Sequence, residues 1–247
     1  MLLGVTSLYI NEIRAGDREA GRLLIENGLR AEKNIDFLLG LYEDGELLAT
    51  AGAFRDSLRL IAVKKERQGE GLLSRLIGEV ISREFSRGYS KLFCYTKAEN
   101  SVKLREFGFF ELVSFAGFVF MENDRNGLQS YIERLKQEGE EQEKGLNIEN
   151  AQGPISAIVM KADPFSLGHL FLCDLACEKS RVVHLFIVRE DRAFFSFQER
   201  QALIKEGLKN KKNIIFHDTA SYLISSGVFP QYFVQDDGEA AKIQSGL

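Results

Sequence analysis

The segment VMKADPFSLGH, Val159 to His169, constrains the fold of this chain more than any other. It follows a β-branched apolar run and leads into leucines at helical spacing, Leu170, Leu172 and Leu175. This order predicts a strand, a loop and a helix that begins near Ser166. The free N–H groups and the dipole at such a helix start favour an anion such as phosphate. Gly168 permits close approach of a ligand, and His169 supplies a cation or a hydrogen-bond donor beside it.

Strands and helices continue to alternate after this loop. The expected strands cover residues 155–160, 182–188 and 213–217, and the expected helices cover residues 168–179 and 197–208. Such an order predicts right-handed βαβ units and a Rossmann-like parallel sheet. A ligand is then expected at the carboxyl ends of the strands, where the SLGH loop lies.

The first half of the chain has a different pattern. It predicts an amphipathic helix over 17–29, a hairpin of strands 36–42 and 46–54 around Asp44-Gly45, and a third strand over 58–63. A helix is expected from residue 72, then a strand over 92–95, a helix over 101–107 and paired strands over 111–121. This order predicts a mixed, mainly antiparallel sheet flanked by helices.

A charged segment joins the two halves. Residues 133–149 hold six acidic and three basic side chains, a net charge of −3, and little apolar material. Its start could finish a helix, and the remainder is expected to be a solvated linker. The sequence therefore predicts a two-domain α/β protein with domains at 1–126 and 154–247, separated by a helix and charged linker at 127–153.

Composition limits the classes of function. A formal charge of −4 gives no general reason to expect binding to nucleic acid or to anionic lipid. No apolar run approaches the roughly 20 residues of a membrane span, and the start lacks the features of a signal peptide. Three scattered cysteines are expected to pack in apolar surroundings, so a reducing cytoplasm fits best and no metal site is expected.

The turn Gln68-Gly69-Glu70-Gly71 joins the third strand to a helix, so its N–H groups also face an anion site. The stretch resembles the (Q/R)xxGx(G/A) pyrophosphate loop of GNAT acyltransferases, with Glu66 where Gln or Arg is usual. The later segment TKAENSVKLREFGFFEL also resembles that family. The resemblance implies acyl or pantetheine binding by five residues, Val63, Gln68, Gly69, Gly71 and Asn100.

The loop SLGH resembles the (H/T)xGH signature of nucleotidylyltransferases. Together with HLFIVREDRAFFSFQERQALI and YLISSGVFPQYF, it makes the second half similar to the citrate lyase ligase family, whose loop commonly reads NANPFTLGH. The resemblance implies catalytic roles for Ser166 and His169. It also implies ATP contacts from seven residues, Lys161, Asp163, Phe165, Ser166, Gly168, His169 and Arg200. For Arg200 a surface salt bridge is an equally open interpretation, while His184 is expected to be buried in its strand and His217 could line a pocket.

The sequence departs from this pattern near its end. Enzymes of this type carry a late motif with serine and arginine that holds the triphosphate, whereas only VQDDGEAAKIQSGL follows Phe233. Three or four strands are expected after the joint, against roughly five in a doubly wound sheet. We therefore expect a shortened second domain.

The resemblance implies a ligase that uses ATP, Mg²⁺ and acetate to acetylate the dephospho-CoA-derived thiol on the acyl carrier (gamma) subunit of citrate lyase. Acetyl-adenylate would be the intermediate, and AMP and pyrophosphate the products. Three alternatives remain open. They are an N-acetyltransferase that uses acetyl-CoA, an adenylyltransferase that makes a cofactor, and a shortened ligase that binds nucleotide or carrier without turnover.

Overall fold

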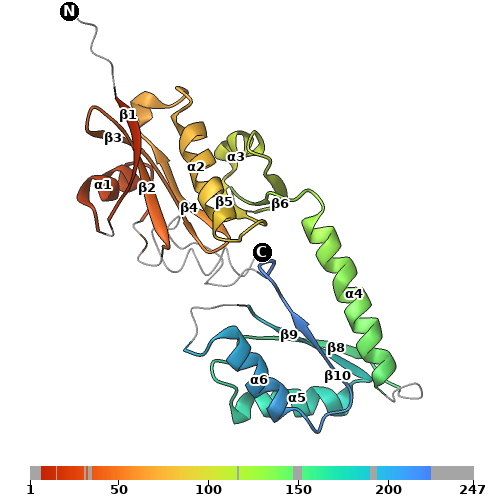
Figure 1. The fold of residues 1–247 in the computed structure, drawn as a ribbon. Helices are drawn as coiled ribbons and strands as arrows, with labels where there is room; N and C mark the ends of the chain where they lie inside the picture. The colour runs from red at the N-terminus through yellow and green to blue at the C-terminus, as the bar shows by residue number, and fades with distance from the viewer. Residues whose placement is uncertain are drawn as a thin grey trace, which may run out of the picture. The chain divides into compact units, whose positions relative to one another are not determined.

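The computed structural model describes residues 7–14, 16–30, 32, 35–115, 117–146, 152–189 and 194–223. These residues form two compact units, the first ending at Arg125 and the second beginning at Asn126. Figure 1 follows the chain through both. The two units are described in turn.

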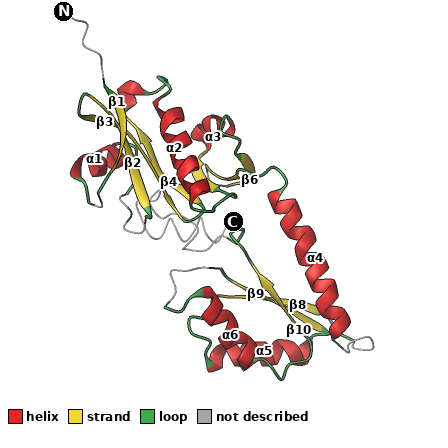
Figure 2. Ribbon diagram, viewed as in Figure 1, coloured by secondary structure: helices red, strands yellow, loops and turns green. Residues whose placement is uncertain are grey.

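The first unit is a seven-stranded sheet with helices on both faces (Figure 2). Its strands are β1 (Leu8–Glu12), β2 (Phe37–Glu43), β3 (Glu46–Phe54), β4 (Ser57–Val63), β5 (Phe93–Lys97), β6 (Phe110–Phe115) and β7 (Phe118–Glu122). They lie in the order β1-β2-β3-β4-β5-β7-β6, and all neighbours are antiparallel except β4 and β5. The expected mixed, mainly antiparallel sheet is confirmed.

Three α-helices and one 3₁₀ turn complete this unit: α1 (Arg18–Glu26), η1 (Lys65–Arg67), α2 (Leu72–Ser86) and α3 (Ala98–Arg105). Leu76, Ile77 and Val80 of α2 are fully buried in a core shared with β2 to β5 and with Leu104 of α3. A second core between α1 and the opposite face of the sheet contains Leu23 and Leu24. Helices α2 and α3 therefore cover one face of the sheet and α1 covers the other.

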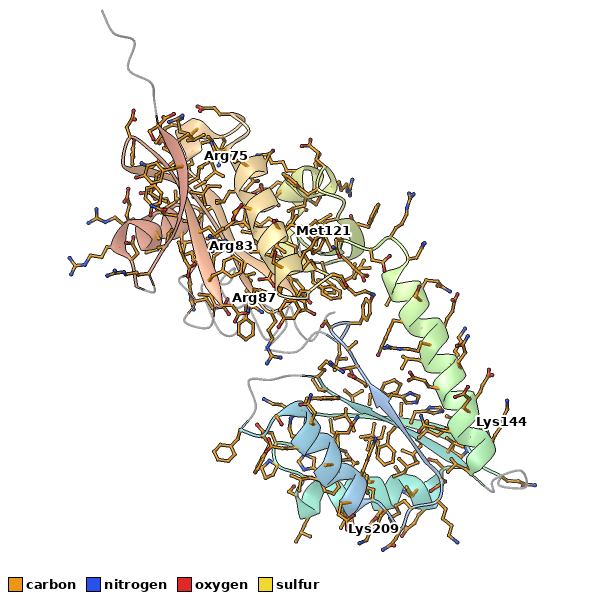
Figure 3. All side chains as sticks on the ribbon, in the orientation of Figure 1. Arg75, Arg83, Arg87, Met121, Lys144 and Lys209 are labelled. Carbon is orange, nitrogen blue, oxygen red and sulfur yellow. The ribbon has the colours of Figure 1, made fainter. Side chains whose placement is uncertain are left out.

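Helix α2 is also tied to the sheet edge by ion pairs. Arg83 lies 3.0 Å from Glu12 at the end of β1, and Arg87 lies 2.6 Å from Asp36 before β2. Figure 3 shows both arginines along the helix. Strand β1 is the main element that the sequence did not predict. It is short, it lies at the edge of the sheet, and its side chains are largely exposed, so its apolar pattern is weak.

Strands β4 and β5 separate part of the way along their length. Only Ser57 with Phe93 and Leu58 with Cys94 are in register. Beyond these pairs β4 has an irregular pairing with β3, and Leu60 has a φ of 54° although it is not glycine. This bulge bends β4 away from its parallel neighbour and opens a gap in the sheet after Leu58.

The second unit holds a parallel sheet of β8 (Ile155–Met160), β9 (Val182–Ile187) and β10 (Ile214–Asp218) in the order β10-β9-β8. Helices α5 (Leu167–Lys179) and α6 (Phe197–Gly207) pack on one face through buried Cys173, Phe197 and Ile204. The expected parallel α/β unit is confirmed. Its described residues include three strands. The segment after residue 223, where a late motif with serine and arginine would be expected, lies outside the described residues.

Helix α4 (Gly127–Gly145) corrects the expectation of a solvated linker. It continues through most of the charged segment, and its inner side packs on β10. Gln142 exchanges two hydrogen bonds with the backbone of Phe216, the Tyr131 hydroxyl donates to the Asp218 carbonyl, and Glu143 pairs with Arg181. A helix with few apolar residues is stable here because tertiary hydrogen bonds replace the missing apolar stripe.

Candidate functional site

The start of α5 brings Ser166 and His169 together. The Ser166 backbone N–H donates to His169 Nδ1 at 3.1 Å, and the Ser166 hydroxyl lies 2.8 Å from the same nitrogen. An N–H can donate only to an unprotonated Nδ1, so the neutral ring carries its proton on Nε2. Ser166, Leu167 and Gly168 are exposed, with Leu167 at 83 %. The first N–H groups of α5 are therefore open to an anion, beside a histidine whose tautomer is fixed.

Phe165 supports the histidine from the other side. Its ring stacks on His169 with 5.9 Å between centroids and an interplanar angle of 21°. It is partly buried against the core of this unit and lies against Gly207 of α6. The ring is thus held between α6 and His169. Contact with adenine remains a prediction, whereas support of His169 is what the packing provides.

Asp163 organises the neighbouring loop. Its carboxylate accepts hydrogen bonds from the backbone N–H groups of Phe194 and Phe195, at 2.7 and 3.0 Å. Loss of water acts to raise the pKa of Asp163, but these two donors and the nearby charges of Lys161 and Arg200 outweigh it, so the pKa lies below its usual value. The carboxylate stays ionised and ties the end of β8 to the segment before α6.

Arg200 does not lie where the surface salt-bridge interpretation placed it. Its side chain is fully buried, with 0 % exposure, so it is not part of a surface salt bridge. The guanidinium donates to three backbone carbonyls, those of Lys161 at 2.7 Å, Val188 at 3.0 Å and Phe195 at 3.3 Å. These carbonyls follow β8, follow β9 and precede α6. In this arrangement Arg200 fixes the loops around the candidate site, and its contact with ATP stays a prediction.

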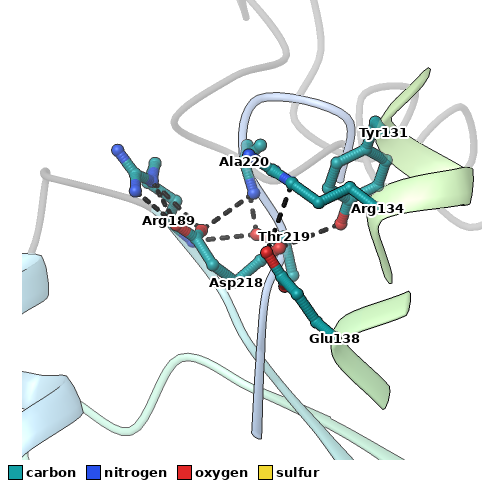
Figure 4. A network of polar contacts seen from close by, with 7 residues as sticks. All are labelled: Tyr131, Arg134, Glu138, Arg189, Asp218, Thr219 and Ala220. Atoms are coloured by element: carbon teal, nitrogen blue, oxygen red, sulfur yellow. Dashed lines mark hydrogen bonds and ion pairs between the residues drawn. The ribbon is translucent and has the colours of Figure 1, made fainter. Parts of the chain in front are cut away.

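A polar network at the ends of β9 and β10 was not anticipated from the sequence (Figure 4). The Arg189 side chain donates to both carboxylate oxygens of Asp218, and the Arg189 backbone N–H donates to the Thr219 hydroxyl at 3.0 Å. Asp218 also accepts from the Ala220 N–H at 2.9 Å. The sequence could have indicated this network by position, because Arg189 and Asp218 both stand at the carboxyl ends of predicted strands.

His184 and His217 form a pair under α4 and do not join Ser166 and His169. Their rings stack, with 2.8 Å between Nδ1 of His184 and Nε2 of His217. His217 is 4 % exposed, and burial, with the neighbouring His184, lowers its pKa to about 4. Burial also lowers the pKa of His184. His184 was expected to be buried in its strand, but it is only half-buried. His217 faces Gly139 of α4.

The first unit contains a cavity of about 580 Å³. All five residues predicted to bind an acyl or pantetheine group line it: Val63, Gln68, Gly69, Gly71 and Asn100. Other lining residues come from β4, β5, α2 and α3 and from the turn after α1. The cavity lies where β4 and β5 separate, so the backbone gap and the turn with Gly69 and Gly71 open into one space.

The turn before α2 has the backbone that such a role requires. Gly69 and Gly71 have φ of 92° and 76°, and a Cβ at either position would meet nothing within 4 Å. Glycine is therefore required here by conformation, and the open space leaves room for a ligand. Arg67 on this turn is held by Glu43 at 2.6 Å and by Glu70 at 2.8 Å, so its charge is already balanced.

Within the described ranges, no group of three or more His, Cys, Asp or Glu side chains could hold a metal ion. Among the same residues, no helix is long and apolar enough to span a bilayer.

The geometry defines a two-unit α/β protein with a GNAT fold followed by a parallel α/β unit that has an exposed helix start beside His169. Comparison with family models agrees: residues 6–109 match the acetyltransferase (GNAT) family, and residues 155–247 match the citrate lyase ligase C-terminal domain. The chain is a relative of the citrate lyase ligases over both units.

It is 32 % identical over 219 residues to the citrate (pro-3S)-lyase ligase of Escherichia coli, covering 88 % of this chain and 59 % of that protein. It is 34 % identical to the ligase of Klebsiella pneumoniae, covering 90 % and 62 %. The chain thus spans about three fifths of the length of these relatives. A solved ribosomal-protein-S18-alanine N-acetyltransferase from Escherichia coli is 18 % identical, with a TM-score of 0.39, over 47 % of this chain and 92 % of that one.

Proposed function

We propose that the chain is an ATP-dependent ligase that acetylates the prosthetic-group thiol on the acyl carrier subunit of citrate lyase. The observation that carries the proposal is the Ser166–His169 contact at the open start of α5. It supplies several N–H donors and a fixed Nε2–H at one place, which suits the phosphates of ATP. The similarity to named citrate lyase ligases supports the choice of substrates.

In the first step, an acetate oxygen bonds to the α-phosphorus of ATP, and the bond from that phosphorus to pyrophosphate breaks. The products are acetyl-adenylate and pyrophosphate. Negative charge grows on the departing oxygen, so a donor placed in advance stabilises the transition state. His169 Nε2 and the N–H groups at the start of α5 are the donors proposed for this step. Mg²⁺ enters as part of the Mg·ATP substrate.

In the second step, the carrier thiol bonds to the acetyl carbon, the bond to AMP breaks, and the thiol proton passes to solvent. The first unit is proposed to hold the pantetheine arm in the cavity lined by Val63, Gly69 and Asn100. The gap between β4 and β5 offers such an extended arm a space lined by both apolar and polar residues.

The test is acetate-dependent release of AMP by the 247-residue chain with deacetylated citrate lyase. AMP should appear only when acetate, ATP and the lyase are all present. Acetate-dependent exchange between ATP and pyrophosphate should occur without the lyase, because the adenylate forms first. Exchange that does not depend on acetate would overturn the proposed reaction.

A second candidate is supported by the same cavity and by the match of residues 6–109 to the acetyltransferase family. In this case the first unit transfers acetyl from acetyl-CoA to an amine. Acetylation of an amine without ATP would support this candidate. Transfer that requires ATP and acetate would reject it.

A further inference from the structure

The cavity of the first unit is lined from both faces of its sheet. Gln68, Gly69, Leu73 and Asn100 come from α2, α3 and the turn before α2, on one face. Asn27 and Leu29 come from the end of α1 and the turn after it, on the other face. Two substrates can therefore meet in this gap, one from each side of the sheet. The turn with Gly69 and Gly71 lies on the face of the sheet where the pantetheine arm is proposed to bind.

Lys97, the last residue of β5, lies on the α1 side of this space. Side chains alternate along a strand, so Lys97 shares a face with Tyr95, whose ring stacks on Phe120, and not with Cys94 in the α2 core. Its Nζ reaches Gly28 at the end of α1, 3.5 Å from where a Cβ would stand. Among the residues of the first unit that the structure describes, none forms a hydrogen bond or ion pair with the Lys97 side chain.

The other charged residues on the cavity wall do not occupy this position. Arg67 is engaged by Glu43 and Glu70. Glu99, Lys103 and Glu106 belong to α3 and the turn after it, the element that packs on the α2 face through Leu104. Among the described residues that line the cavity, the charge presented from the α1 side is therefore that of Lys97, and it is positive.

A positive charge on this side does not suit an amine acceptor, which is itself cationic before it reacts. It suits a substrate with an anionic leaving group. We infer that the second substrate in this cavity is an acyl phosphate, acetyl-adenylate, and that Lys97 binds its phosphate. This inference rests on the proposed function and identifies the acyl donor of the first unit. The new carbon–sulfur bond forms as the bond from acetyl carbon to phosphate oxygen breaks, AMP keeps that electron pair, and the thiol proton passes to solvent.

The test supplies preformed acetyl-adenylate and pantetheine to the full chain and measures acetyl-pantetheine and AMP above the rate without protein. Lys97→Met should lower kcat/KM for acetyl-adenylate about 10- to 100-fold, the range for a charged hydrogen bond, without changing KM for pantetheine. Lys97→Arg should restore most of the rate. Lys65→Met, an exposed lysine outside the cavity, should match the unmodified chain.

Three results would overturn the inference: no acetyl-pantetheine with the unmodified chain, no effect of Lys97→Met, or an equal effect on KM for pantetheine. An unchanged melting temperature of Lys97→Met and Lys97→Gln separates a local effect from unfolding. ATP–pyrophosphate exchange reports on the second unit alone. If exchange occurs but transfer from acetyl-adenylate does not depend on Lys97, the inference is rejected and the proposed function stands. If transfer depends on Lys97 but no exchange occurs, adenylate formation by this chain is rejected and the inference stands.

Discussion

The backbone and the side chain of Ser166 both contact Nδ1 of His169. The backbone N–H donates to this atom at 3.1 Å, and the hydroxyl oxygen lies 2.8 Å from it. The backbone contact does not depend on which side chain stands at residue 166. Serine at this position can therefore add to the orientation of His169, but it is not the only group that sets it.

Removal of each side chain should separate these two contributions. His169→Ala should lower acetate-dependent ATP–pyrophosphate exchange at least 100-fold, the usual cost of losing a transition-state donor. Ser166→Ala keeps the backbone donor to Nδ1 and should cost about tenfold or less. Equal losses would mean that the hydroxyl acts directly on substrate, and undiminished exchange in His169→Ala would remove the histidine from the chemistry.

Arg200 should behave as a structural residue. Arg200→Met removes a buried charge and leaves the carbonyls of Lys161, Val188 and Phe195 without this donor. The free energy of unfolding of the second unit should fall by about 2–4 kcal/mol, measured by urea denaturation. Arg200→Lys should also destabilise it, because one ammonium cannot reach three carbonyls spaced for a guanidinium. Unchanged stability with a raised KM for ATP would instead support the phosphate role predicted from sequence.

The fold was largely predictable because each half has a strong periodic signal. Leu72, Leu76 and Val80 mark α2, and the apolar runs at residues 155–160 and 182–187 mark parallel strands. The weak elements were β1, whose side chains are exposed, and the later turns of α4, whose stability comes from partners such as Phe216 that lie far away in sequence.

The sequence predicted which residues form the loops of the site, but it did not predict what each of them contacts. Ser166 and His169 are three residues apart at a predicted helix start, so their contact is local. Asp163 and Arg200 contact backbone atoms of distant segments, which no pattern of side chains encodes. The pairing of Arg189 with Asp218 likewise depends on the register of β9 with β10.

Gly69→Asp should affect only the thiol-transfer step. It places a side chain at a φ of 92° and adds a negative charge to the turn proposed to face the phosphates of the arm. Transfer of acetyl to the carrier should fall at least tenfold, whereas ATP–pyrophosphate exchange should be unchanged. Gly69→Asn is the matched control, because asparagine has the same shape without the charge and tolerates positive φ. If exchange and transfer fell together, the two units would not divide the reaction in this way.

Acid should destabilise the second unit through its histidine pair. The pKa of His217 is lowered to about 4 by burial and by His184, while an unfolded histidine has a pKa near 6.5. Between these two pKa values the unfolded chain binds more protons than the folded chain. The contribution of His217 to the free energy of unfolding is therefore complete above about pH 6.5 and is lost as the pH falls toward 4. Glu143 and Arg181 act on His184 in opposite directions.

Urea denaturation of the second unit at pH 7 and pH 5 measures this effect. The unmodified chain should lose roughly 1–2 kcal/mol between these values, since one pKa unit corresponds to about 1.4 kcal/mol. His217→Phe should lose much less, because it removes the titrating group and keeps an aromatic ring under α4. An equal loss in both proteins would show that other groups cause the acid sensitivity.

Two helical glycines in the second unit should respond to alanine with opposite signs. A Cβ on Gly139 of α4 would lie 3.6 Å from Cε1 of His217, an ordinary contact. A Cβ on Gly207 of α6 would lie 2.6 Å from the ring of Phe165, which is too close. Both changes gain helix propensity of up to about 1 kcal/mol, but only Gly139→Ala gains it without a clash.

Gly139→Ala should therefore raise the free energy of unfolding by about 0.5–1 kcal/mol, and Gly207→Ala should lower it by about 1–3 kcal/mol, the usual cost of overpacking. Because Phe165 stacks on His169, Gly207→Ala should also slow ATP–pyrophosphate exchange, and Gly139→Ala should not. Gly207→Ala together with Phe165→Leu relieves the clash and should regain stability but not exchange, since the ring that supports His169 is then missing. A double variant with full exchange would mean that His169 is oriented by Ser166 alone.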